Sequence, residues 1–346
     1  MIRNLDFTMM SFGISIIICV HNGALRIAPS LKAISEQNLP LGISVELLII
    51  DNASSDSTAS FANEYWNILN APFPLKIIEE QKPGKANALT TGYNEAKYEL
   101  MLLCDDDNWL QPDYLKTVIE IFSKYPDIGL LGGYGKAVFN GTEKPDWFDK
   151  WENCYVCGKH HSKNGFLQSS DFSIWGAGSV IRKTMWDFLL TNGFSFYNSV
   201  EAGKPMTEDA ELSMVITFTG HRLYFNDSLW FMHDFRDGRI NRKTFIEQQA
   251  LNGKGNAILY MYLLANKNCK KSKIPAKWLT LITIATLSLR YCWSLLKPFN
   301  YPNQIYLFNI IKELILNFST YTRKAKESSV WIKKIKHTYP LAKFKT

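Results

Sequence analysis

Three consecutive carboxylates, Asp105–Asp107, follow directly on the apolar segment Leu100–Leu103. This apolar run predicts a short buried strand, and Pro112 then opens a segment with helical spacing of its apolar residues. The carboxylates are therefore predicted to lie in a strand-to-helix turn, where open α/β sheets bind ligands. Asp is also common in turns for purely structural reasons. The carboxylates of Asp105 and Asp107 are suitable oxygen ligands for a hard divalent cation. Such a cation would keep further coordination positions for substrate phosphates.

A second acidic group, Thr207-Glu208-Asp209, precedes a segment of helical apolar spacing that ends at Gly220. Acids in a first helical turn offset the helix dipole, so capping is one interpretation. The other is general base catalysis, in which a carboxylate accepts a proton from an attacking hydroxyl. The residues themselves leave both interpretations open. Lys82 and Lys85 are equally ambiguous, since each is either a solvated charge or a positive group beside the site.

A fold must position these groups. The N-terminal half of the sequence predicts strands that alternate with helices. Each predicted strand is continuously apolar, which is typical of a parallel sheet with both faces covered. The fold class is therefore α/β. The predicted strands are Ile14–Val20, Val45–Ile50, Leu75–Ile78 and Leu100–Leu103, with helices over 27–34, 84–96 and from Pro112 onward.

Two common nucleotide-binding motifs are missing from the sequence. The segment Pro83-Gly84-Lys85 lacks the other Gly and the Ser or Thr of a phosphate-binding loop, because Glu79 and Ala86 stand at those positions. The first strand is not followed by Gly-x-Gly-x-x-Gly, which disfavours a dinucleotide dehydrogenase.

Composition and charge add limits on size, compartment and partners. The chain has 346 residues, 46% of them hydrophobic, and a net charge of +7, so it can bury a full core. From Tyr321 to Thr346 eight Lys or Arg face one acid, Glu327, and this difference of seven equals the net charge. The tail therefore predicts a local anionic partner, either a membrane surface or a nucleic acid. Asp6 and the short apolar run before Ser11 predict no signal peptide, and six scattered cysteines predict a reducing compartment.

The C-terminal part has a different, helical pattern. Phe245–Leu264 and Leu307–Phe318 are predicted helices, and Trp278–Leu296 is mostly apolar. Between Lys277 and Arg290 twelve residues lack charge, fewer than the ~20 that a spanning helix needs. These helices either cover the α/β part of the chain or lie in a bilayer interface. The thin polar stripe of the apolar segment is Thr280, Thr283, Thr286, Arg290, Ser294 and Lys297.

Several stretches between Ser11 and Phe245 together resemble the family 2 glycosyltransferases of the GT-A fold. One departure follows the first strand, where the family often shows Pro-Thr-Tyr-Asn and this chain has Cys19-Val20-His21-Asn22. The stretches that carry the resemblance are Ser15–Gly23, Leu47–Asp56, Gly84–Ala88, Asp105–Asp107, Trp175–Lys183 and Glu208–Leu212.

The resemblance implies transfer of a sugar, with inversion, from a nucleotide diphosphate donor to a hydroxyl. It implies Asp209 as general base with Glu208 beside it. It implies Mg²⁺ or Mn²⁺ held by Asp105 and Asp107, with His233 as a further candidate near the metal or diphosphate. The remaining implied roles are nucleotide contacts by Val20, Asn22, Asp51, Asn52, Lys85 and Asp106, and acceptor contacts by Trp175, Gly176, Ala177 and Gly178.

A Cys154-x-x-Cys157 pair with His160 and His161 resembles half of a zinc site. Because no second Cys or His pair follows at suitable spacing, we do not interpret it as one. Buried packing is an equal alternative for His233, and aromatic core packing is an alternative for the Trp175 turn.

We therefore predict a GT-A catalytic domain over residues 11–245 and a helical, basic extension over 246–346. The predicted enzyme uses a nucleotide sugar, most simply a UDP-sugar, and a lipid-linked or saccharide acceptor, and builds a bacterial surface polysaccharide or glycolipid. It is expected in the cytoplasm, peripheral on the inner face of the membrane, without a nucleic-acid partner. Alternatives are a nucleotidyltransferase that uses the same acidic turn and an inactive nucleotide-sugar-binding scaffold.

Overall fold

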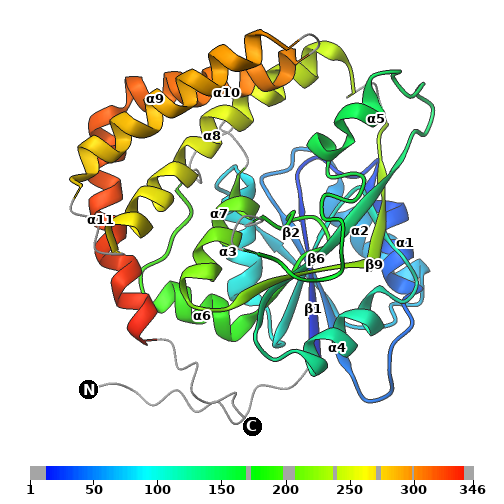
Figure 1. The fold of residues 1–346 in the computed structure, drawn as a ribbon. Helices are drawn as coiled ribbons and strands as arrows, with labels where there is room; N and C mark the ends of the chain where they lie inside the picture. Colours follow the sequence, from blue (N-terminus) through cyan, green and yellow to red (C-terminus); the bar gives the residue numbers. More distant parts are fainter. Residues whose placement is uncertain are drawn as a thin grey trace.

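The computed structural model describes residues 13–168, 173–197, 207–236, 240–269, 274–297 and 300–338. Residues 11 and 12 of the predicted catalytic domain and residues 339–346 of the basic tail lie outside these ranges. A central sheet is flanked by helices, and four long helices lie together on one side of the molecule (Figure 1).

The sheet follows the order β3-β2-β1-β4-β8-β6-β9-β5, and β7 pairs with β9. The predicted strands are present, and β1, β2, β3 and β4 pair in parallel, as expected. The other half is mixed, because β8 runs antiparallel to β4 and β6, and β9 runs antiparallel to β5. The strands are β1 (Gly13–Val20), β2 (Ser44–Asp51), β3 (Leu75–Glu79), β4 (Leu100–Asp105), β5 (Asn108–Leu110), β6 (Ile128–Val138), β7 (Gly165–Phe166), β8 (Val180–Arg182) and β9 (Arg222–Asp234).

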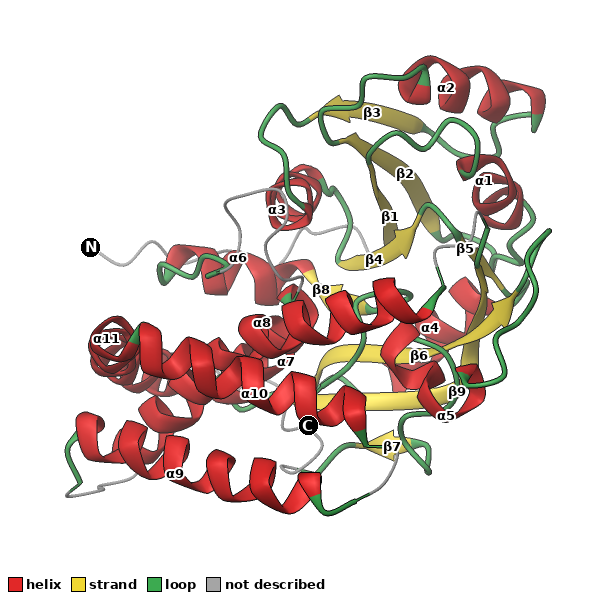
Figure 2. Cartoon of the chain, turned by 90° about the horizontal axis from the view of Figure 1, so that it is seen from above, coloured by secondary structure: helices red, strands yellow, loops and turns green. Residues whose placement is uncertain are grey.

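Helices cover both faces of this sheet, which explains why its strands are apolar throughout (Figure 2). In β1, Ile14, Ile16 and Ile18 belong to one buried cluster and Ile17 to the other, so alternate side chains serve opposite faces. The helices are α1 (Ile27–Ser35), α2 (Thr58–Ile68), α3 (Lys85–Glu95), α4 (Tyr114–Lys124), α5 (Phe148–Trp151), α6 (Lys183–Thr191), α7 (Glu208–Phe218), α8 (Arg242–Cys269), α9 (Ala276–Leu295), α10 (Tyr301–Leu316) and α11 (Phe318–Thr338).

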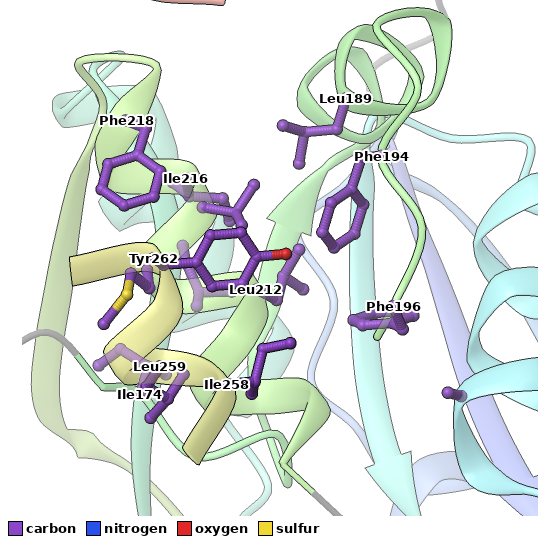
Figure 3. Packing of buried hydrophobic residues seen from close by; sticks show 14 of the residues in the cluster. Ile174, Leu189, Phe194, Phe196, Leu212, Ile216, Phe218, Ile258, Leu259 and Tyr262 are labelled. Atoms are coloured by element: carbon purple, nitrogen blue, oxygen red, sulfur yellow. The ribbon is translucent and has the colours of Figure 1, made fainter. Parts of the chain in front are cut away.

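The C-terminal helices share one hydrophobic core with the sheet and the helices on one of its faces. Figure 3 shows Ile258, Leu259 and Tyr262 of α8 packed near Leu212 and Ile216 of α7. The same buried cluster continues into α10 and α11, through Ile310, Leu314, Ala325, Ile332 and Ile335 among others. The predicted division after residue 245 falls inside α8 and stays a prediction. In the part of the chain that the structure describes, helices long and apolar enough to cross a bilayer are absent.

Candidate active site

Asp105 ends β4 and makes an ion pair with the first residue of α3. Its Oδ1 lies 2.8 Å from Nζ of Lys85. Gly84 precedes this lysine with φ +125°, a backbone conformation that side-chain-bearing residues rarely adopt. Burial lowers the pKa of Lys85, but the Asp105 carboxylate more than offsets this effect and the net shift is upward. Lys85 is therefore a fixed cation at the end of the sheet.

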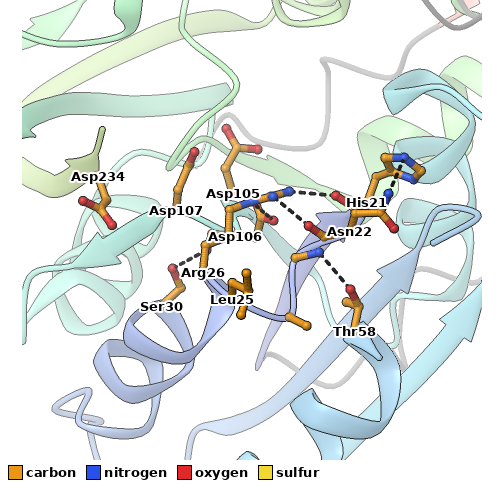
Figure 4. A network of polar contacts seen from close by, with 12 residues as sticks. His21, Asn22, Leu25, Arg26, Ser30, Thr58, Asp105, Asp106, Asp107 and Asp234 are labelled. Carbon is orange, nitrogen blue, oxygen red and sulfur yellow. Dashed lines mark hydrogen bonds and ion pairs between the residues drawn. The ribbon is translucent and has the colours of Figure 1, made fainter. Parts of the chain in front are cut away.

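Asp106 faces the opposite way, toward α1 (Figure 4). Its Oδ2 lies 2.7 Å from Nε of Arg26, and Arg26 also donates to the carbonyl oxygens of His21 and Asn22. Burial, with a contribution from the Asp107 charge, raises the pKa of Asp106 to about 7 although Arg26 opposes the shift. This network ties the end of β1 to the acidic turn.

Asp107 lies beside His233, with 3.6 Å between Oδ1 and Nε2. The contact arises because β5 pairs with β9 in a register that sets Asn108 opposite His233. Among the described residues, a cluster of three or more His, Cys, Asp or Glu side chains able to hold a metal ion is absent. The structure thus places Asp105, Asp107 and His233 near one turn without joining them into such a cluster.

The predicted nucleotide contacts lie at the ends of β1 and β2. Val20 is buried and is the register partner of Asp51. Asn22 is exposed, has φ +50° and accepts a hydrogen bond from the amide of Ser55. The side chain of Asn52 instead holds the loop before α3: it donates to the carbonyl oxygens of Glu80 and Lys82 and accepts from the amide of Gly84. Asn52 therefore fixes the loop that precedes Lys85.

Glu208 and Asp209 form the first turn of α7. The amide of Gly176 donates to Asp209 Oδ2 at 3.1 Å, and the amide of Ala210 donates to Oδ1 at 2.7 Å. Burial raises the pKa of Asp209, while these two hydrogen bonds and the charge of Lys85 act against the shift. Burial also raises the pKa of Glu208, to about 7. Both acids thus hold a proton more tightly than an exposed carboxylate does.

The turn at positions 175–178 supports this arrangement from the other side. A Cβ atom on Gly176 would lie 3.3 Å from Cβ of Asp209, so the glycine allows close approach of the two segments. Gly178 has φ +71°, and its carbonyl oxygen accepts a hydrogen bond from the buried hydroxyl of Tyr114 at 2.6 Å. The ring of Trp175 lies against His160, with 3.8 Å between ring centroids.

A pocket of about 640 Å³ joins these groups. Residues from both predicted acid groups line it, although Asp106, Asp107, His233, Gly178 and the nucleotide candidates of β1 and β2 do not. The predicted site residues in its lining are Lys85, Asp105, Trp175, Gly176, Ala177, Glu208 and Asp209.

Helices α8 and α10 form a further wall of this pocket, which the sequence reasoning missed. Thr244, Gln248, Asn252 and Asn256 line it from α8, and Tyr306 lines it from α10. These four α8 residues recur every four positions, so they form a polar stripe on a helix that is otherwise largely buried. That stripe is the signal from which they could have been found.

The cysteine and histidine pairs do not form a metal-binding cluster among the residues that the structure describes. Cys154 lines the pocket and Cys157 is buried, with its Sγ 3.9 Å from Nδ1 of His233. His161 contacts the carbonyl oxygen of Ser173 through Nε2. Burial lowers the pKa of His160 to about 3, so this ring is neutral at ordinary pH.

Comparison with known proteins finds glycosyltransferases. Residues 15–183 match the model of glycosyl transferase family 2. The chain is 31% identical over 121 residues to a poly-beta-1,6-N-acetyl-D-glucosamine synthase of Staphylococcus epidermidis, a match that covers 35% of this chain and 28% of that protein. It is 24% identical over 131 residues to the putative glycosyltransferase EpsH of Bacillus subtilis, covering 38% and 36%. Each match thus spans little more than a third of the relative, or less.

Solved structures agree at the level of the fold. S. aureus TarS 1-349 in complex with UDP-GlcNAc superposes with a TM-score of 0.54 and 15% identity, over 97% of this chain and 93% of that one. The mannosyltransferase PcManGT of Pyrobaculum calidifontis, in complex with GDP-Man and Mn2+, superposes with a TM-score of 0.52 and 15% identity. This match covers 95% of this chain and 87% of that one. The predicted resemblance to family 2 glycosyltransferases and the predicted GT-A fold are confirmed. The predicted enzyme class, glycosyltransferase, agrees with this family and with these relatives.

Proposed function

We propose that this protein is an inverting glycosyltransferase that moves a sugar from a nucleotide diphosphate donor to an acceptor hydroxyl. The observation that carries the proposal is that one pocket is lined both by the Lys85–Asp105 pair and by Asp209. The pair belongs to the carboxyl end of the sheet, whereas Asp209 comes from the start of α7. Residues at the end of the sheet can therefore bind the leaving diphosphate, while a residue of α7 contacts the attacking hydroxyl.

Asp209 is proposed as the base. The Gly176 amide fixes one oxygen of its carboxylate, so the group is oriented before the acceptor binds. A hydroxyl becomes acidic as it attacks, and a carboxylate in contact with it can then take the proton. The raised pKa of Asp209 brings its proton affinity closer to neutral pH, where transfer is efficient. A single displacement of this kind inverts the anomeric centre, and Glu208 is proposed to support it.

The leaving group is anionic, and the site has cationic and metal-binding residues for it. Lys85 supplies a fixed positive charge, and a divalent ion, when bound, would neutralise charge that develops on the diphosphate. Asp107 and Asp105 are suitable oxygen donors, and His233 lies beside Asp107. Mg²⁺ typically takes one or two carboxylates and completes its coordination with phosphates and water, so these residues fit Mg²⁺ or Mn²⁺ without a preformed three-residue cluster. The presence of Mn2+ in the PcManGT complex supports this assignment.

A UDP-sugar is proposed as donor because TarS, which shares the fold, was solved with UDP-GlcNAc. The acceptor, a lipid-linked or saccharide hydroxyl, is proposed to enter between the Trp175 turn and α8. An aromatic ring and a row of side-chain amides suit a sugar, whose ring stacks and whose hydroxyls need hydrogen-bond partners. The product would be a surface polysaccharide or glycolipid, made in the cytoplasm at the inner face of the membrane.

A donor screen tests this function. Purified protein is incubated with a panel of sugar nucleotides and Mg²⁺ or Mn²⁺, and released nucleoside diphosphate is measured. One donor should be hydrolysed slowly without acceptor. A parallel reaction holds a nucleoside triphosphate and a sugar phosphate, and release of pyrophosphate there would favour the nucleotidyltransferase alternative. Donor binding without any release would favour the inactive scaffold.

A further inference from the structure

Helix α9 exposes large apolar side chains along one side, although Thr280 and Ser294 face the protein. Thr280 and Ser294 of the predicted polar stripe are 0% and 2% exposed. Leu289 and Trp293, in contrast, are 73% and 65% exposed. We name the exposed apolar residues on one side of this helix and its C-terminal end the α9 stripe: Trp278, Leu281, Ile282, Leu289, Trp293 and Leu296. Its members recur at intervals that place them along one side of the helix.

Helix α10 packs beside α9 and also exposes large apolar side chains. The ring of Tyr291 in α9 packs near Phe308 in α10, with 6.0 Å between ring centroids, and Phe308 and Ile315 are exposed. Both helices lie at the outer edge of the molecule, on the far side of α8 from the sheet (Figures 1 and 2). Several large apolar side chains exposed on neighbouring helices indicate an interaction site.

The charge of this region identifies the kind of partner. From residue 248 to residue 312 the sequence has no Asp or Glu, and it carries nine cations: Lys254, Lys267, Lys270, Lys271, Lys273, Lys277, Arg290, Lys297 and Lys312. A second copy of the chain docked on the α9 stripe would bring the same cations together without compensating acids. An anionic bilayer instead offers apolar volume for the stripe and negative charge for Lys277 and Lys297 at its two ends.

We propose that the α9 stripe and the adjoining face of α10 lie flat in the interface of an anionic bilayer. Trp278 and Trp293 suit this depth, because an indole ring combines a large apolar body with one polar N–H. The inference deepens the membrane association proposed above and rests on the exposure of α9, not on glycosyl transfer. It also replaces the basic tail as the principal anchor, since α11 buries Ala325, Ile332 and Ile335 in the core.

Vesicle sedimentation tests the proposal. Full-length protein is mixed with vesicles of phosphatidylcholine and phosphatidylglycerol, or of phosphatidylcholine alone, at low and high salt. Leu289→Ser combined with Trp293→Ser should weaken binding to the anionic vesicles at least about tenfold, from the apolar area that no longer leaves water. Lys277→Gln with Lys297→Gln should weaken it by roughly fivefold for each charge removed, and salt should mimic this loss.

A matched control removes equally exposed apolar side chains elsewhere. Leu41→Ser with Ile68→Ser should bind vesicles like the parent, because both residues are exposed and far from α9 in sequence. Donor hydrolysis without vesicles is measured for each protein, so that a failed glycosyltransferase assignment leaves the vesicle result readable. Unchanged binding by the α9 double variant would overturn the proposal. So would light scattering that shows a dimer in the parent and a monomer in this variant, because a second copy would then cover the stripe.

Discussion

The two groups of acids differ in what faces them. In the turn after β4, each carboxylate lies beside a basic side chain: Asp105 beside Lys85, Asp106 beside Arg26 and Asp107 beside His233. At the start of α7, the hydrogen-bond partners of Asp209 are backbone amides. Glu211, one turn further on, takes its hydrogen bonds from Tyr197 and Tyr262.

This difference separates two kinds of chemistry. A turn whose acids are balanced by basic groups can accept a dication and a diphosphate together at little net cost in charge. At the start of α7, burial outweighs the hydrogen bonds and the charge of Lys85, so the pKa values of Glu208 and Asp209 rise and both acids hold protons more tightly. Burial has the same effect on Asp106 despite its Arg26 partner. The first arrangement suits binding of a leaving group, and the second suits proton transfer. The predictions below test this division, beginning with the largest expected effect.

Asp209→Asn should remove the general base and leave binding of the donor and the metal intact. An asparagine oxygen can still accept the Gly176 amide, so the turn should keep its shape. We expect sugar transfer to fall by roughly two to four orders of magnitude, the usual value of a general base, with donor and metal affinity nearly normal. Transfer rates measure the loss of activity, and titrations of the variant with donor and metal measure the two affinities.

Product stereochemistry completes this test. NMR of the product should show an anomer opposite to that of the donor. Retained configuration, or near-normal transfer by Asp209→Asn, would remove Asp209 from the role of base.

Asp107→Asn should show the complementary defect, on the donor side. We expect loss of most activity with an unchanged melting temperature, because the amide has the size of the carboxylate and keeps the backbone contact with Asp234. EDTA should stop the parent enzyme, and Mg²⁺ or Mn²⁺ should restore it. Should the variant stay fully active in EDTA, the divalent metal would have no place in the reaction.

Lys85→Gln should affect both sides, because its charge acts on Asp105 and on the α7 acids. Lys85 opposes the rise in the pKa of Glu208 and Asp209, so its removal raises both pKa values further. The acid limb of the pH profile of kcat/KM should therefore move to higher pH. Activity at neutral pH should fall roughly ten- to hundredfold with the lost leaving-group charge.

Lys82→Gln is the matched control, since Lys82 is exposed and belongs to the same loop. It should leave the profile in place. An acid limb that stays fixed in Lys85→Gln would show that Lys85 does not tune the base.

The sequence predicted those parts of the sites that depend on neighbouring residues, but not the positions that depend on contacts between distant segments. The end of β4, the turn after it and the acids of α7 follow from periodicity within a few residues, and the structure has them where expected. The position of His233 depends on the pairing of β5 with β9 across more than a hundred residues. The α8 wall of the pocket depends on how helices pack, and the exposure of α9 depends on which of its two faces meets the core. Periodicity finds such faces but cannot say what covers them.

Glu211 provides the smallest and most specific test, because it shares the burial of Asp209 but does not line the pocket. Burial raises its pKa from the usual 4.5 to about 7, although hydrogen bonds from Tyr262 and Tyr197 oppose the shift. The folded protein therefore binds a proton here that the unfolded chain has released, and stability contributed by this site falls as pH rises between these two values. Glu211→Gln can keep both hydrogen bonds on one oxygen and cannot ionise. We expect it to match the parent near pH 4.5, and to be more stable by roughly 3 kcal/mol above pH 7. Denaturant unfolding at both pH values measures the difference, with transfer activity as the control that should stay near the parent's. A variant with the parent's full loss of stability between the two pH values would show that Glu211 is charged when buried, and that burial does not by itself make the α7 acids hold protons.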